Sequence, residues 1–188
     1  MLYVNTGNSV FGLVLSGTGP NTTATELPIY NLANDGLSSN APVLLLPSGA
    51  LLLATTGGTQ YGQIIELTKP SIKGAQWTRT NIYTFSCTDG AYPEGPLTPN
   101  GPGKYLGTTY GGGADGDGTV YSLSVPATSG GAWTVQLLHS FPSPDENVGF
   151  GPTTGVVVNH GAIFGLASLN GDTVETIGFE LTSVAGAQ

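Results

Sequence analysis

The feature that most limits how this chain can fold is a pattern that returns every 50 to 58 residues. A strand-like segment begins near residues 2, 52, 105 and 163, and each is followed by a glycine-rich turn. Trp77 and Trp133 lie 56 residues apart, as do Phe85 and Phe141. A repeat of this length usually forms one supersecondary unit, which buries its apolar faces against its neighbours.

Each unit contains four short apolar segments bounded by Gly, Pro or Asn, which is the pattern of β-strands joined by tight turns. No apolar segment keeps a helical period for more than about two turns. We expect about fourteen strands in a single domain, arranged as units over residues 2–50, 51–104 and 105–162 with a partial unit over 163–188.

The sequence therefore predicts an all-β fold, and four strands in about 50 residues favour a β-propeller-like array of about three and a half four-stranded blades. A β-sandwich and an open repeat array are the alternatives. Closed propellers need at least about four blades. Three arrangements stay open: a small irregular ring, an assembly of two or more chains, and a fragment of a longer array.

Three motifs carry a resemblance to a known repeat. Tyr105–Thr109 reads Tyr-Leu-Gly-Thr-Thr, Gly118–Leu123 reads Gly-Thr-Val-Tyr-Ser-Leu, and Leu138–Phe141 reads Leu-His-Ser-Phe. These motifs, and more weakly the segment from Leu52 to Phe85, resemble the GloVer-type tandem repeat of bacterial secreted and surface-anchored proteins. The resemblance implies a propeller-like module outside the cell or on its surface, and it brings no catalytic residues.

Charge excludes several classes of partner. The chain has 4 Lys and Arg against 12 Asp and Glu, a net charge of −8, and its cations are scattered. This balance argues against binding nucleic acid phosphates or anionic membrane surfaces. No apolar stretch reaches the ~18 residues of a membrane span, and no signal peptide is visible in this numbering. The single cysteine, Cys87, excludes an internal disulfide, and we expect it to be a buried apolar residue.

One segment has a pattern that suits a metal. Asp115 and Asp117 alternate with glycines, and such carboxylates can wrap Ca²⁺. The rest of a calcium loop is missing, and Asp-Gly is a strong hairpin signal. We therefore favour a tight turn here, with Ca²⁺ as the one candidate ion and no other cofactor expected.

Candidate ligand-binding residues are Tyr92, Tyr110, Asp145 and Glu146, which are aromatic or acidic residues of loops. Asp145 and Glu146 are adjacent, and Asp89 and Glu94 occupy the matching loop of the preceding unit. Tyr61, Trp77 and Trp133 are further aromatic candidates, although the two tryptophans share one repeat position and suit packing better. The two histidines, His139 and His160, belong to no arrangement that resembles a catalytic triad or a zinc site.

Three hypotheses about function follow. The first is a non-enzymatic extracellular module that binds a glycan or a cell-surface protein or builds a surface assembly, with self-association to complete the propeller as a further expectation. The second is a hydrolase or lyase acting on polysaccharide, which requires carboxylates at a fixed separation across a cleft. The third is a structural subunit of an extracellular fibre, recruited through unpaired edge strands.

Overall fold

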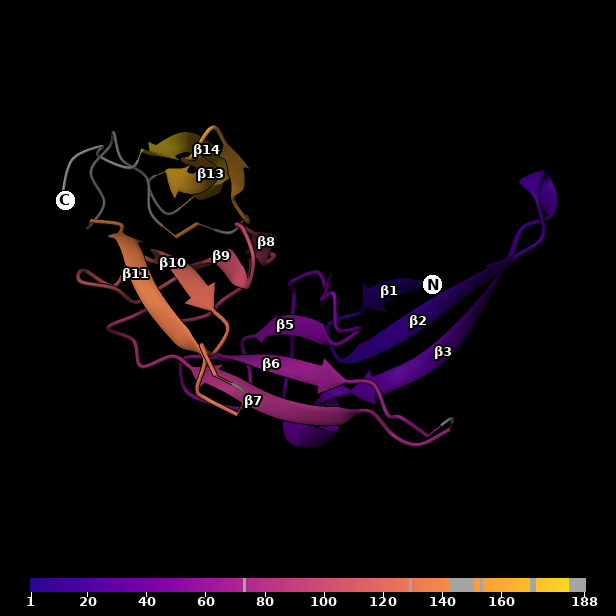
Figure 1. Ribbon diagram of the computed structural model, residues 1–188. Helices are drawn as coiled ribbons and strands as arrows, with labels where there is room; N and C mark the ends of the chain where they lie inside the picture. The colour runs from indigo at the N-terminus through magenta and orange to yellow at the C-terminus, as the bar shows by residue number, and fades with distance from the viewer. Residues whose placement is uncertain (73, 129, 143–150, 153, 170–171, 183–188) are drawn as a thin grey trace.

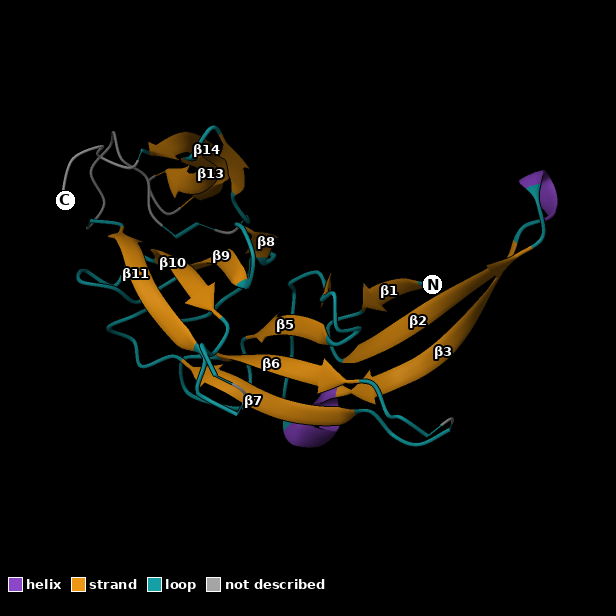
Figure 2. Cartoon of the chain, in the orientation of Figure 1, coloured by secondary structure: helices purple, strands orange, loops and turns teal. Residues whose placement is uncertain are grey.

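The protein is all-β. The computed structural model describes residues 1–188 except 73, 129, 143–150, 153, 170–171 and 183–188 (Figure 1). Within the described residues, fourteen strands form four antiparallel sheets, none of them closed into a barrel. Two single-turn 3₁₀ helices, Gly19–Asn21 and Leu32–Asp35, are the helical elements of this part of the chain (Figure 2).

The sheets follow one another along the chain. Sheet 1 contains β1 (Leu2–Asn5), β2 (Ser9–Ser16) and β3 (Thr23–Asn31). Sheet 2 contains β4 (Leu44–Leu45), β5 (Leu51–Thr55), β6 (Gln63–Thr68) and β7 (Thr78–Thr84). Sheet 3 contains β8 (Thr98–Pro99), β9 (Lys104–Thr109), β10 (Thr119–Ser124) and β11 (Thr134–Ser140). Sheet 4 contains β12 (Val157–Asn159), β13 (Ala162–Leu169) and β14 (Asp172–Leu181).

The sheet boundaries lie one strand away from the unit boundaries expected from the sequence. The segment expected to close the first unit, around Leu44, instead opens sheet 2 by pairing with Leu52 of β5. Thr98 likewise pairs with Leu106, and Val157 with Phe164. The strands are therefore grouped as three, four, four and three rather than as three full units and a half. A repeat fixes a period but not its starting point, so the sequence alone does not place this boundary.

The same pairing pattern recurs in the first three sheets. Each has a register shift between its last two strands, at Val10/Phe11, Ile64/Ile65 and Val120/Tyr121. A β-bulge at a fixed place bends and twists the strand locally. We call residues of different sheets corresponding when they lie the same number of positions from this register shift, or when they pair across strands with residues that do.

Three apolar cores lie between the four sheets, one at each junction. The first core, between sheets 1 and 2, contains Val10, Leu51 and Ile65. The second, between sheets 2 and 3, contains Leu52, Phe85 and Tyr121. The third, between sheets 3 and 4, contains Leu106, Phe141 and Ala167. The sheets thus stack face to face in chain order, and Figure 1 shows them following an arc with sheets 1 and 4 at its ends.

Alternation along single strands produces this stack. Successive side chains of a strand point to opposite faces of its sheet. In β5, Leu51 and Leu53 enter the first core while Leu52 enters the second. In β9, Tyr105 enters the second core and Leu106 the third. The two middle sheets therefore bury apolar side chains on both faces.

A glycine allows one aromatic ring to lie flat across its neighbouring strand. Gly107 pairs with Tyr121, and a Cβ at Gly107 would overlap the tyrosine ring. The corresponding pair in sheet 4 is Gly165 and Phe179, with the same close approach. Tyr121 is fully buried, which raises the pKa of its phenol, and its hydroxyl has no hydrogen-bond partner among the described residues.

This pair yields a stability prediction. We expect Tyr121→Phe to leave the free energy of unfolding unchanged or raise it by up to about 1 kcal/mol, because it removes a buried polar group that makes no hydrogen bond. Gly107→Ala should lower it by about 1–3 kcal/mol, because the new methyl group overpacks the ring. Urea unfolding followed by tryptophan fluorescence measures both. A loss of more than about 1 kcal/mol in Tyr121→Phe would contradict this account of the core.

Candidate functional site

Three loops meet at one end of the junction between sheets 2 and 3. Residues 56–62 join β5 to β6, residues 85–97 carry the chain from sheet 2 to sheet 3, and residues 110–118 join β9 to β10. The backbone amide of Tyr92 donates to the carbonyl of Tyr61 at 2.9 Å, and that of Tyr110 donates to the carbonyl of Tyr92 at 3.0 Å. Backbone hydrogen bonds therefore hold three tyrosines from three loops in a row.

Further backbone bonds fix the two longer loops against each other. Ala91 and Gly111 exchange a pair of hydrogen bonds of 2.7 and 2.9 Å, and the amide of Gly113 donates to the carbonyl of Cys87 at 2.7 Å. Gly112 has a φ of 76°, and a Cβ there would overlap the backbone of residues 87–91. Glycine is required at this position for both reasons.

A cavity of about 320 Å³ lies among these loops. Its wall contains Tyr61, Tyr92, Tyr110, Cys87 and Asp117, together with alanine and glycine backbone. The side chains of Tyr92 and Tyr110 are exposed and that of Asp117 is half-buried. The site therefore offers aromatic faces, phenol hydroxyls and one carboxylate to a molecule that enters from solvent.

Two residues of this wall have a backbone conformation that is unusual for their type. Cys87 has a φ of 68° and Tyr92 a φ of 58°, in the left-handed region that favours glycine. Strain of this kind costs on the order of 1–3 kcal/mol and concentrates at ligand sites. The expectation that Cys87 is a buried apolar residue is wrong: it is half-buried in a loop, because its carbonyl anchors the facing loop.

A tyrosine–aspartate contact shapes the loop that follows β7. The hydroxyl of Tyr83 donates to the carboxylate of Asp89, which also accepts from the amide of Ser86 at 2.8 Å and from its hydroxyl at 3.1 Å. Burial, reinforced by Asp89, raises the pKa of Tyr83, so the phenol stays protonated and remains a donor. Asp89 is thus held as part of the loop that leads into the site.

The corresponding contact follows β3, where Tyr30 donates to Asp35 and Arg79 also pairs with Asp35 at 3.0 Å. The spacing of the two residues is a sequence signal for this contact, which the expectations above do not include. Tyr30 and Asp35 are five residues apart, and Tyr83 and Asp89 are six apart. In sheet 3 the tyrosine's place is taken by His139 of β11. Burial lowers the pKa of His139, and its ring centroid lies 4.8 Å from that of Phe141 in an edge-on contact.

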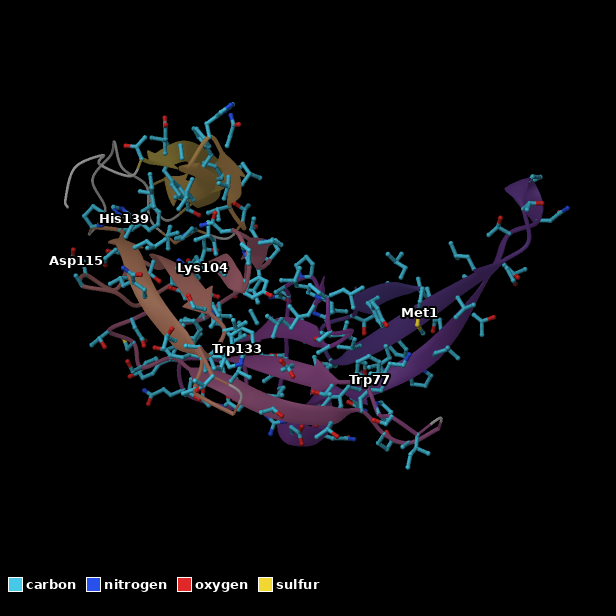
Figure 3. All side chains as sticks on the ribbon, in the orientation of Figure 1. Met1, Trp77, Lys104, Asp115, Trp133 and His139 are labelled. Atoms are coloured by element: carbon cyan, nitrogen blue, oxygen red, sulfur yellow. The ribbon has the colours of Figure 1, made fainter. Side chains whose placement is uncertain are left out.

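From the candidate residues, the structure brings together Tyr61, Tyr92, Tyr110 and Asp117. Asp115 does not line the cavity: its exposed side chain lies at the tip of its loop (Figure 3). Asp145 and Glu146 lie outside the described residues. Among the residues described, no three His, Cys, Asp or Glu side chains gather as a metal site would require. Ca²⁺ at Asp115 and Asp117 stays a prediction.

The two tryptophans belong to the packing of the sheets. Trp77 meets the ring of Tyr3 edge-on at 6.2 Å beside the first core, and Trp133 lies 6.2 Å from the ring of Tyr105 beside the second. Both are labelled in Figure 3. Neither tryptophan lines the tyrosine cavity.

No protein-family model and no curated protein sequence matches the chain. In the part of the chain that is described, no helix is both long and apolar enough to cross a membrane.

The loop contact can be tested by removing one hydroxyl. We expect Tyr83→Phe to lower the free energy of unfolding by about 1–2 kcal/mol, because a half-buried hydrogen bond to a charged group is lost. Tyr30→Phe is the matched control. It should cost less, because Asp35 keeps Arg79 as a partner. Chemical unfolding of both variants at pH 7 makes the comparison, and equal losses would contradict the assigned roles.

Proposed function

We propose that this chain is a non-enzymatic, β-propeller-like module whose four sheets are its blades, and that it binds a glycan in the tyrosine cavity. Two kinds of observation support the propeller-like form: four sheets stack face to face in chain order, and each runs from strand to neighbouring strand. Together with the resemblance to GloVer-type repeats, this leads us to place the module outside the cell or on its surface.

The observation that carries the binding proposal is a comparison between junctions. The hydrogen bond from Tyr92 to Tyr61 has a counterpart at each of the other two junctions. At the first, Ser39 donates to Gly7 at 2.9 Å, and at the third, Gly151 donates to Asp117 at 2.7 Å. This backbone hydrogen bond therefore forms at junctions where neither residue is a tyrosine. Tyr61 also packs against the second core, whereas Tyr92 and Tyr110 are exposed. Since the fold does not need the rings of Tyr92 and Tyr110, we infer that they serve a ligand.

The chemistry of the cavity suits a carbohydrate. Exposed tyrosine rings offer flat apolar surfaces with a polar edge, which match the C–H faces and hydroxyl rim of a sugar ring. The carboxylate of Asp117 can accept hydrogen bonds from sugar hydroxyls, and phenols can both donate and accept. Backbone bonds hold Tyr61, Tyr92 and Tyr110 in place before a ligand arrives, which lowers the entropy lost on binding.

The test is titration calorimetry of the purified chain with cellohexaose, chitohexaose and maltohexaose. We expect one of them to bind with a dissociation constant below about 1 mM, equal to a binding free energy of about −4 kcal/mol. Tyr92→Asn should weaken that binding at least about tenfold. This variant removes the ring while asparagine tolerates the left-handed φ, so the fold should persist.

Ile72→Asn is the control, because Ile72 is exposed in the β6–β7 loop and takes no part in the cavity. It should bind as the unaltered chain does. Failure of all three sugars to bind would overturn the glycan proposal, as would equal binding by Tyr92→Asn. Cleavage of a bound sugar, seen as shorter products by chromatography, would overturn the non-enzymatic part.

A further inference from the structure

We propose that the outer faces of sheets 1 and 4 bind each other between two copies of this chain, forming a closed head-to-tail pair. In the stack, each sheet has a leading face, turned toward the preceding sheet, and a trailing face, turned toward the following one. At every junction the trailing face of one sheet packs on the leading face of the next. The leading face of sheet 1 and the trailing face of sheet 4 have no such neighbour among the described residues.

The leading face of sheet 1 has the same apolar pattern as the covered leading face of sheet 2. In sheet 2 this face carries the cross-strand pairs Leu51–Leu67 and Leu53–Ile65, and all four side chains are fully buried. The corresponding pairs in sheet 1 are Leu2–Leu13 and Val4–Phe11. Here Leu2 is 59% exposed and the other three are half-buried. Sheet 1 therefore has the same kind of apolar face as sheet 2, but no described sheet covers it.

The trailing face of sheet 4 resembles the trailing face of sheet 2, which packs against a leading face inside the stack. In sheet 2 the trailing face has the pair Leu44–Leu52, which packs into the second core. Sheet 4 has the corresponding pair Val157–Phe164, followed by Leu166. Val157 is 65% exposed and Leu166 is 45% exposed. These residues line a hollow of about 290 Å³, and a hollow of about 420 Å³ is lined by Leu2 and Leu13 at the other end.

An acidic residue at this end is compatible with the proposed contact. Glu180 lies opposite Phe164 on the trailing face of sheet 4. Glu66 has the corresponding place in sheet 2, opposite Leu52, where it is half-exposed at the margin of the second core. An internal junction therefore already accommodates a carboxylate at this position.

Geometry favours a second copy as the occupant. The two free faces are different and complementary, so they make a head-to-tail contact rather than a symmetric patch. The four sheets follow an arc with sheets 1 and 4 at its ends (Figure 1). We infer that two copies make this contact twice and close. Each closed pair then stacks eight sheets through six internal and two intermolecular junctions, which follows from four sheets and three cores per chain.

Sedimentation equilibrium across a range of concentrations tests the proposal. We expect a mass approaching twice 19.1 kDa. Each copy carries a net charge of −8, so association should strengthen as salt screens the repulsion between copies. Leu2→Asp and Leu166→Asp should each give a monomer, because each variant spoils both junctions of the pair. Ile72→Asp adds the same charge at a residue that is 75% exposed and away from both end faces, and it should remain paired.

Mixing the two monomeric variants provides the most specific measurement. A Leu2→Asp copy keeps an intact trailing face and a Leu166→Asp copy keeps an intact leading face, so the mixture should recover one junction and form a mixed dimer. A monomer at all concentrations would overturn the proposal. So would a Leu166→Asp variant that stays paired, a mixture that does not associate, or masses above two chains. Tyr92→Asn should leave the mass unchanged, so the result is independent of glycan binding.

Discussion

The constraint on which the rest of this structure depends is that its middle sheets are apolar on both faces. Leu51, Leu52 and Leu53 are consecutive and fully buried, yet they enter two different cores. A sheet of this kind is unstable unless another sheet covers each face, because exposed apolar area costs roughly 25 cal/mol per Å². Stacking in chain order satisfies this demand, and the bulges at corresponding positions give neighbouring sheets a common twist.

Because the cores hold the stack together, the loops at its margin can differ from junction to junction. The backbone bond shared by all three junctions carries two tyrosines at one of them and small or acidic residues at the others. The left-handed conformation of Tyr92 is possible because its neighbours fix the backbone on both sides. Stability and the proposed binding thus belong to separate parts of the molecule, which is the usual division between a scaffold and its loops.

The sequence predicts the strands well and their grouping less well. Periodic glycines and alternating apolar residues mark all fourteen strands, because turn chemistry and alternation are local properties. Grouping depends on which partner a short strand such as β4 or β8 chooses, and two residues of pattern do not decide this. Tyr92, Tyr110 and Asp117 are predictable as loop residues with binding chemistry. Their meeting with Tyr61 is not, because it depends on hydrogen bonds between three separate loops.

The order of the strands within each sheet has a consequence for how the polypeptide acquires its structure. Every described strand pairs with its immediate neighbours in sequence, so each ladder closes only a short loop. Short loop closure is fast and entropically inexpensive. Folding can therefore proceed hairpin by hairpin, from one end, while later segments are still being synthesised. At each stage the most recently formed sheet presents a bare apolar face until the next one arrives, which makes interrupted synthesis the moment of greatest risk for aggregation.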